Sequence, residues 1–298
     1  MQGEKIMKKQ RRRFGDRHDG KLLKKIDPFY KIVPYIMKTR VDSQVFFDDK
    51  IVLDKTEKYL KDVREQNINI RFLHIVCAAI IRTIAQKPRI NRFVSGRKLY
   101  ARNGIYISLA VKKDMSEESP ETTVKVKFEP TDTIYDVVDK VNEVIKENQG
   151  QEVNNDTDKT AKLIMMCPRF LVKGIVAFVN WLDKRGRMPK ALNRVSPFHT
   201  SLFITDMGSL GVQPVYHHIY EFGTTSIFVA FGLKNKEKYI DRNNNINERK
   251  FINLKVVVDE RICDGFYYAK AFRIFRRYME NPHLLETPPE KVVEDNEI

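Results

Sequence analysis

Residues 252–265 read INLKVVVDERICDG and carry the clearest structural signal in the chain. The Val-rich run at 252–258 is typical of a buried strand, and the polar loop that follows it leads directly into an expected helix at 266–280. Asp264 stands where a helix N-cap is expected. A second polar cluster, FITDMGSLG at 203–211, also follows a strand-like run. We therefore look for chemistry at these two strand ends.

The rest of the chain mixes strand-like and helix-like segments without strict alternation. Residues 71–87 are apolar nearly all round and stop at Pro88, which predicts a buried helix. Residues 105–111 alternate between apolar and polar side chains, as a half-buried strand does. Further strands are expected at 124–128, 201–205 and 224–232. The pattern predicts an α+β domain with one large mixed sheet flanked by helices.

Composition excludes several classes of protein. Of the 298 residues, 42% are hydrophobic and 10% aromatic, which is enough for a core and excludes a disordered chain. Cys77, Cys167 and Cys263 lie far apart in apolar runs, so they predict neither a disulfide framework nor a metal site. The sequence has no secretory signal pattern and no apolar run long enough to span a membrane. These features predict a cytoplasmic protein without a bound metal.

The charge is concentrated at the termini. The chain holds 54 Lys and Arg against 39 Asp and Glu, and residues 1–25 alone hold ten basic and three acidic side chains. We expect 1–25 to be a basic flexible arm, 26–285 to be the folded domain and 286–298 to be an acidic tail. Such an arm is most simply a solvated terminus, although basic segments also bind nucleic acid or anionic membranes.

Four motifs, together with their order along the chain, resemble the catalytic domain of the 2-oxoacid dehydrogenase acyltransferases. This is the dihydrolipoyl acyltransferase family, which has the chloramphenicol acetyltransferase fold. Residues 259–265, DERICDG, are similar to the closing Asp-His-Arg-x-x-Asp-Gly signature. Residues 204–208, ITDMG, are similar to Ile-Ser-Asn-x-Gly, and 88–91, PRIN, to Pro-x-x-Asn. The strand ending at 108–111, SLAV, completes a resemblance that runs from about residue 28 to residue 283.

The resemblance implies a homotrimer whose sites lie between subunits and transfer acyl groups from thioesters. In the family, a His takes the proton from the thiol of coenzyme A or dihydrolipoamide, and a Ser hydroxyl from the neighbouring subunit stabilises the oxyanion. Here Glu260 stands at the His position and Thr205 at the Ser position. Asp264 is retained, and Asp206 replaces the usual Asn beside the substrate. No covalently bound cofactor is implied, and acyl-CoA is the expected substrate.

Whether the resemblance extends to acyl-transfer activity depends on Glu260. A reference Glu has a pKa about 4 units below that of a thiol, so proton transfer begins nearly 6 kcal/mol uphill at about 1.36 kcal/mol per unit. Burial in a dry channel can raise a Glu pKa by about 3–5 units and close most of this gap. Arg261 is the alternative partner, because an ion pair with Glu260 would keep the carboxylate ionised and inert.

Residues 163–190 are read as an apolar insertion, because the corresponding part of the family is short and polar. The run at 163–182 is most simply a core or subunit-interface helix; it is alternatively a lid over an acyl channel or, with the basic arm, a membrane-surface segment. Trp181 is the single Trp and would report either on a lid over the channel or on docking to a membrane surface.

The histidines are weaker candidates for the missing base. His199 precedes the Thr205 strand and is a candidate substrate-binding residue, although a structural role is the simpler interpretation. His217 and His218 superficially resemble an acyltransferase His-His motif, but Phe222 stands where that motif has Asp.

We therefore expect a stand-alone, CoA-dependent acyltransferase-like protein with Glu260, Asp264 and Thr205 at its site. Any lipoyl-bearing or other acyl acceptor would be on another chain. The alternative is a catalytically inactive trimer that binds acyl-CoA or a partner, which the replacements at Glu260 and Asp206 favour.

Overall fold

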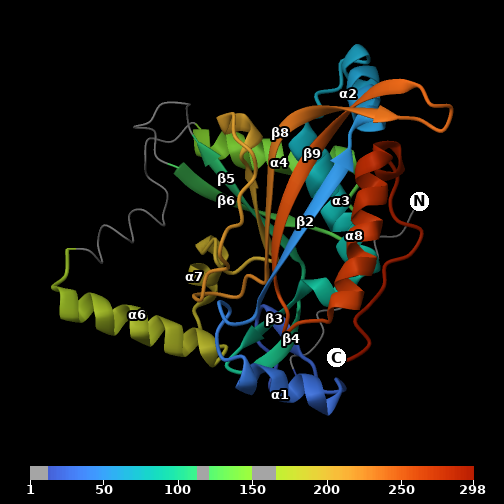
Figure 1. The fold of residues 1–298 in the computed structure, drawn as a ribbon. Helices are drawn as coiled ribbons and strands as arrows, with labels where there is room; N and C mark the ends of the chain where they lie inside the picture. Colours follow the sequence, from blue (N-terminus) through green and yellow to red (C-terminus); the bar gives the residue numbers. More distant parts are fainter. Residues whose placement is uncertain (1–12, 113–120, 150–165) are drawn as a thin grey trace, which may run out of the picture.

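A computed structural model describes residues 13–112, 121–149 and 166–298, and within these ranges a six-stranded mixed sheet forms the centre of the molecule (Figure 1). Across the sheet, the strands are β2 (Gln44–Val52), β9 (Ile246–Asp259), β8 (Ile227–Ile240), β7 (Leu202–Asp206), β5 (Ile105–Lys112) and β6 (Glu121–Phe128). Strand β7 runs parallel to both β5 and β8, and the other neighbours are antiparallel. The predicted α+β fold with a large mixed sheet is confirmed.

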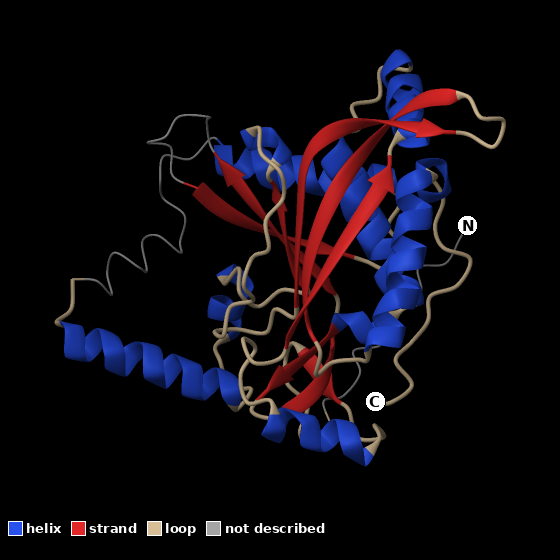
Figure 2. Ribbon diagram, in the orientation of Figure 1, coloured by secondary structure: helices blue, strands red, loops and turns tan. Residues whose placement is uncertain are grey.

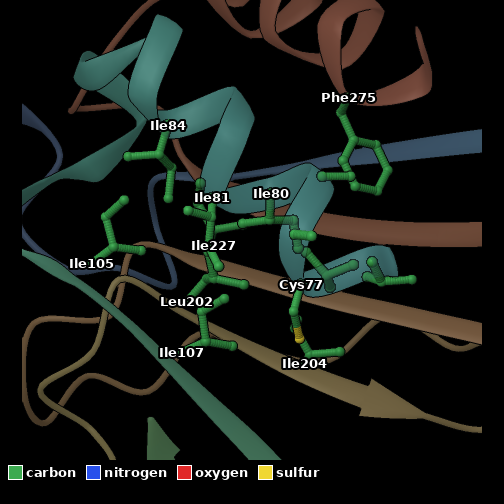
Figure 3. Close-up of a cluster of buried hydrophobic side chains, with 14 of the residues drawn as sticks. Cys77, Ile80, Ile81, Ile84, Ile105, Ile107, Leu202, Ile204, Ile227 and Phe275 are labelled. Carbon is green, nitrogen blue, oxygen red and sulfur yellow. The ribbon is translucent and has the colours of Figure 1, made fainter. Parts of the chain in front are cut away.

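One face of this sheet is covered by helices α3 (Phe72–Gln86), α4 (Ile134–Gln149) and α8 (Gly265–Glu280) (Figure 2). The predicted buried helix at 71–87 is α3, in which every residue from His74 to Ala85 is buried. Figure 3 shows Ile80, Ile81 and Ile84 of α3 packing on Leu202 and Ile227 of the sheet. This aliphatic layer holds β7 and β8 in place, and β7 is one of the two strands at whose ends chemistry was sought.

The other face of the sheet has a smaller aromatic cluster. Phe203, Phe228 and Val257 lie in register on β7, β8 and β9, and Ile219 from the loop at 211–224 covers them. Farther along the same face, Phe46 of β2 is 54% exposed. One side of the sheet is therefore sealed by helices, whereas the other is only partly covered within the chain.

The part of the expected arm at residues 13–25 is folded, which corrects the prediction of a flexible arm over 1–25 for those residues; residues 1–12 lie outside the described ranges. Strand β1 (Gly20–Leu22) joins β4 (Lys98–Arg102) and β3 (Arg92–Ser95) in a second, antiparallel sheet. Arg17 is 2% exposed and donates to Asp19, Ser95 and Asp183. Asp19 and Asp183 neutralise the buried charge of Arg17, and these contacts tie the arm to the end of α6.

The acidic tail also packs on the domain. Both oxygens of Asp295 accept hydrogen bonds from Arg92, each at 2.6 Å, and the two side chains are buried. The backbone N–H of Val293 donates to the Ala85 carbonyl at the end of α3. The tail is therefore attached at both the small sheet and the core helix.

Helix α6 (Arg169–Lys184) leads away from the body of the molecule and is attached at its C-terminal end (Figures 1 and 2). Among its residues only Asp183 is buried. At the attachment, the Lys184 carbonyl lies so close to Gly96 that an added Cβ there would approach it to 2.5 Å, and Gly96 has φ +56°. The prediction of a core helix at 163–182 is therefore wrong for the described part of this segment within one chain, because the core elements do not cover its apolar face.

The described residues include some further short elements. These are α1 (Pro28–Ile36), α2 (Asp54–Glu65), α7 (Lys190–Val195) and 3-10 turns at Pro88–Asn91, Gly208–Leu210 and Pro282–Leu285. Within the described ranges, no helix is both long and apolar enough to cross a membrane.

Candidate functional site

The loop from Asp259 to Gly265 is held rigidly between β9 and α8. Asp259 is fully buried and receives two hydrogen bonds from Arg261, from Nε to Oδ1 at 2.8 Å and from Nη2 to Oδ2 at 2.7 Å. Ser43 Oγ donates to the same carboxylate at 3.1 Å. A buried bidentate ion pair of this kind fixes both orientation and spacing. The loop can therefore present the residue between them in a defined direction.

That residue is Glu260, whose side chain is exposed within the chain. Its backbone N–H donates to the Ser43 carbonyl at 2.9 Å. Arg261 binds Asp259 and also donates to the Met37 carbonyl at 3.2 Å. The alternative in which Arg261 neutralises Glu260 is therefore wrong, because the guanidinium is already engaged on the buried side of the loop.

Asp264 caps α8, as the sequence predicted. Its Oδ1 accepts the Tyr267 N–H at 2.7 Å, and its Oδ2 accepts the Tyr30 hydroxyl at 3.2 Å. Burial and the neighbouring Asp264 carboxylate both raise the pKa of Tyr30, so this phenol stays protonated as the donor. The ion pair that fixes the loop lies at its start, between Asp259 and Arg261, whereas Asp264 fixes its end by hydrogen bonds.

Thr205 and Glu260 are far apart in one chain. Thr205 is in register with Ala230, which is in register with Lys255 on β9. Glu260 lies five residue steps beyond Lys255, which corresponds to about 17 Å at roughly 3.3 Å per strand residue. The structure therefore does not bring these two candidates together within a subunit.

The surroundings of Thr205 place it on the partly covered face of the sheet. It is 8% exposed, and its Oγ1 lies 3.9 Å from Met207 Sδ, a weak contact for a hydroxyl. Asp206 is half-buried, and its Oδ1 accepts the Ser209 N–H at 3.0 Å. Burial raises the pKa of Asp206 above its usual value. The Asp206 carboxylate thus holds the turn after β7.

His199 belongs to a buried polar network. It is 1% exposed, its Nδ1 lies 2.8 Å from Ser196 Oγ, and its Nε2 lies 3.2 Å from Asp183 Oδ2 without good hydrogen-bond alignment. Burial lowers the pKa of His199 despite the neighbouring carboxylate. Burial opposes ionisation of Asp183, but His199 and Arg17 outweigh it and lower the pKa of that carboxyl. His199 therefore helps to anchor α6, and it does not contact the Glu260 loop.

The adjacent histidines lie on the partly covered sheet face. The ring of His217 stacks on Phe228 with 4.6 Å between centroids, and His218 meets Tyr220 edge-on at 4.9 Å. These ring contacts explain the positions of His217 and His218 without a catalytic role.

A basic cavity beside the loop was not apparent from the sequence. Its volume is about 350 Å³, and it lies between α1, the turn after β3, the end of α6 and the Glu260 loop. Its lining contains two carboxylates, Asp183 and Glu221, and a larger number of cations from separate parts of the chain: Lys38, Arg40, Arg97, Lys184 and Arg261. Burial lowers the pKa of Arg40, whose Nη1 and Nη2 donate to the Glu221 and Val94 carbonyls. Lys38, Arg97 and Lys184 are exposed, so they supply charge for an anionic ligand.

Lys125 is a second feature that the sequence did not reveal, and its contacts lie away from the Glu260 loop. Its Nζ donates to the Asn193 and Ser196 carbonyls at 3.0 and 3.3 Å. Burial lowers its pKa to about 7. In the alternating apolar and polar pattern of β6, Lys125 falls on the polar side, so the pattern did not predict its burial. Only the packing of α7 over that side buries it.

The remaining candidate chemistries are weak. Within the described residues, no group of three or more His, Cys, Asp or Glu side chains is arranged to hold a metal ion. Burial raises the pKa values of the Cys77 and Cys263 thiols to about 12, so neither is a ready nucleophile.

Comparisons with known proteins are consistent with the resemblance seen in the Glu260 loop and with the fold of the central sheet. A family model, 2-oxoacid dehydrogenases acyltransferase (catalytic domain), matches residues 184–287. The chain is related to these acyltransferases. The matched stretch contains Thr205 and Glu260 together with the loop that holds Glu260, so the resemblance inferred from the motifs is confirmed.

Solved structures with this fold include acyltransferases of two kinds. A probable dihydrolipoamide acetyltransferase from Listeria monocytogenes 4b F2365 has 14% identity over 86% of this chain and 92% of its own, with a TM-score of 0.54. A chloramphenicol acetyltransferase has 8% identity over 87% of this chain and 99% of its own, with a TM-score of 0.53. The predicted chloramphenicol acetyltransferase-like fold is confirmed, and no curated protein matches the sequence.

Proposed function

We propose that this protein is a stand-alone, CoA-dependent acyltransferase whose site is completed between subunits. The observation that carries the proposal is the loop at 259–265, in which the buried Asp259–Arg261 ion pair and the Asp264 cap hold Glu260 outward at the family's catalytic position. Buried charged side chains that hold one carboxylate in an exposed position are typical of a functional site.

In the proposed reaction, the Glu260 carboxylate takes the proton from the thiol of the acceptor. The thiolate attacks the acyl thioester carbon, and the carbonyl oxygen becomes an oxyanion that accepts a hydrogen bond from Thr205 of a neighbouring subunit. Collapse of the tetrahedral intermediate breaks the original C–S bond, and the leaving thiolate takes the proton back from Glu260. The Glu260 carboxylate is regenerated, and no further reactant is needed.

Two features support a shared site in a homotrimer. Thr205 and Glu260 are separated by about 17 Å along the strand direction within one chain, so a single subunit cannot place both against one acyl group. Glu260 is exposed in the single chain, and a neighbouring subunit would supply the dry surroundings that raise the pKa of a carboxylate toward that of a thiol.

The basic cavity supports coenzyme A as the substrate. Lys38, Arg97 and Lys184 present exposed cations a short distance from the loop, because Arg261 lines the same cavity. Phosphate groups are recognised by such clusters of Lys and Arg. We assign this cavity to the phosphates of coenzyme A. The acyl acceptor is then a second thiol, such as a lipoyl group on another chain.

The test is thiol release from acyl-CoAs of increasing chain length, with and without dihydrolipoamide. We expect Glu260→Gln to lower turnover by about 10²–10⁴-fold, because the general base is lost. Thr205→Ala should lower it by about 10²–10³-fold through loss of one oxyanion donor. Asp42→Asn, at an exposed carboxylate outside the loop, is the control and should leave turnover unchanged. Wild-type turnover in Glu260→Gln would refute the mechanism.

The subunit arrangement has its own test. Glu260→Gln and Thr205→Ala chains, each inactive alone, are co-expressed and purified together. In a randomly mixed ring, about one site in four receives Glu260 from one chain and Thr205 from the next, so about a quarter of wild-type activity should return. Mixtures that remain as inactive as the separate variants would show that the site is not shared.

The second candidate is an inactive trimer that binds acyl-CoA. The half-buried Asp206 favours it, because a carboxylate next to Thr205 would oppose a developing oxyanion. In this case the wild type would bind acyl-CoA without turnover, and Glu260→Gln would bind equally well. Turnover gained in Glu260→His would identify an intact site from which the base has been removed.

A further inference from the structure

Helix α6 exposes a broad apolar surface to solvent. Phe170 is 72% exposed, Phe178 58% and Trp181 45%, and the rings of Phe178 and Trp181 stack with 6.0 Å between centroids. Phe170, Gly174 and Trp181 lie on one side of the helix, as their spacing requires, with Leu171 and Phe178 beside them. A monomeric soluble protein rarely exposes so many large apolar groups on one element unless they contact something.

A narrow basic stripe runs along α6 beside this apolar surface. Arg169, Lys173 and Lys184 lie four and eleven residues apart, which places them on one stripe with Asn180. Arg185 follows directly and lies over the Trp181 ring at 4.4 Å. The single carboxylate of the helix, Asp183, is buried and neutralised by Arg17. The exposed charge of α6 is therefore entirely positive.

A second helix with the same character lies at the same end of the molecule. Helix α1 exposes Phe29, Ile32 and Ile36 at helical spacing, with exposures of 67%, 55% and 64%. Exposed lysines surround it: Lys24, Lys25, Lys31 and Lys38. In Figure 1, α1 and α6 both lie along the lower edge, and residues of both helices line the basic cavity.

We propose that α6 and α1 form a docking face for an anionic phospholipid surface. Aromatic and aliphatic groups on one side of a helix with Lys and Arg on the other are the composition of helices that lie in the membrane interface. Because α6 leads away from the body, its apolar side can enter the acyl-chain boundary without unfolding the domain.

Charge distinguishes a lipid surface from a second copy of the chain. The exposed charge of α6 is entirely positive, so pairing two α6 helices would bring like charges together. Anionic headgroups instead neutralise Arg169, Lys173 and Arg185 while the apolar side is buried. Protein interfaces are also depleted in Lys, which is abundant around both helices. The docking face does not depend on acyl transfer.

Trp181 makes the test direct, because it is the only Trp in the 298 residues. The full chain is mixed with vesicles of phosphatidylglycerol and phosphatidylcholine, or of phosphatidylcholine alone, and the emission of Trp181 is recorded with co-sedimentation. We expect a blue shift and sedimentation with the anionic vesicles, loss of both at high salt, and little binding to neutral vesicles.

Matched variants test whether vesicle binding depends on the docking face or on any exposed apolar side chain. Phe178→Asp should weaken partitioning by about tenfold or more, because an apolar ring is replaced by a charge of the wrong sign. Arg185→Glu should weaken it less and reduce the salt dependence. Ile246→Asp, at a 72% exposed position at the start of β9, is the control and should bind like the wild type. Circular dichroism confirms that the variants remain folded.

Two results would overturn the proposal. The first is an absence of sedimentation with anionic vesicles at low salt. The second is a blue shift of Trp181 that rises with protein concentration without vesicles, since this would show that a second copy covers α6. Failure of acyl transfer in the thiol-release assay would leave vesicle binding unaffected, so the two proposals fail separately.

Discussion

Helices α3 and α6 have similar sequences but very different surroundings. The segments that form them both contain Arg-Phe-Leu near the start, at 71–73 and 169–171, and both helices are rich in apolar residues. Their lengths are 15 and 16 residues. Nevertheless, α3 buries twelve residues from His74 to Ala85, whereas α6 buries Asp183 alone. Apolar composition therefore predicts a helix in both cases but predicts burial in only one.

The difference lies in where the polar groups stand. In α3, Arg82 is the one charged side chain within the buried stretch, and its guanidinium reaches the Leu284 and Thr287 carbonyls at the edge of the core. In α6, Lys173, Asn180 and Lys184 form one polar stripe along an otherwise largely apolar helix. A helix of this kind is amphipathic, and it needs a partner that the rest of the chain does not provide.

The sharpest test of the contrast compares one truncation in each helix. Ile81 is fully buried against the sheet, so Ile81→Ala should lower the free energy of unfolding by about 4 kcal/mol through lost burial and a cavity. Phe178→Ala removes a larger side chain but should change it by less than about 0.5 kcal/mol. Urea unfolding followed by circular dichroism measures both. Equal losses would show that α6 is packed in solution.

The second test concerns the attachment of α6. Asp183→Ala leaves the buried Arg17 with Asp19 as its remaining carboxylate and removes the carboxylate next to His199 Nε2. We expect a loss of about 3 kcal/mol, at the lower end of the range for breaking a buried pair, because Asp19 still compensates part of the charge. Lys184→Ala, at the exposed neighbouring position, is the control. Hydrogen exchange of α6 should accelerate only in Asp183→Ala.

The sequence predicted the elements whose partners are local or repetitive. The buried helix at 71–87, the alternating strands and the cap at Asp264 were recognisable because each leaves a periodic or adjacent signal. The anchor of α6 was not, because Arg17, Asp183 and His199 are distant in sequence and nothing in the local pattern pairs them. The basic cavity was missed for the same reason: Lys38, Arg97 and Arg261 meet only after folding.

A third test uses pH and the first turn of α3. His74 is 2% exposed, its Nδ1 accepts the Arg71 N–H at 3.1 Å, and burial together with the Arg71 charge lowers its pKa to about 4. The unfolded chain takes up this proton near pH 6.5, so the stability is present above that pH and is lost as the pH falls toward 4. The loss amounts to about 3 kcal/mol.

Urea titrations between pH 7 and pH 4 measure this loss. The lowered pKa of His199 acts in the same direction, since a neutral buried His is favoured in the folded state. His74→Gln should therefore flatten the pH dependence without abolishing it. An unchanged slope in His74→Gln would assign the acid sensitivity to groups outside α3.

The smallest effect should come from the middle of α6. No atom lies within 4 Å of a Cβ added at Gly174, so Gly174→Ala gains helix propensity without a clash and should stabilise α6 by about 0.5–1 kcal/mol. This corresponds to amide exchange about two- to fivefold slower along the helix. Ala177→Gly, at an exposed position one turn later, is the matched opposite and should speed exchange by a similar factor. In α3, where packing rather than propensity dominates, Ala79→Gly should instead lower global stability. If Ala177→Gly and Ala79→Gly both changed only local amide exchange and left global stability unchanged, packing would not be the difference between the two helices.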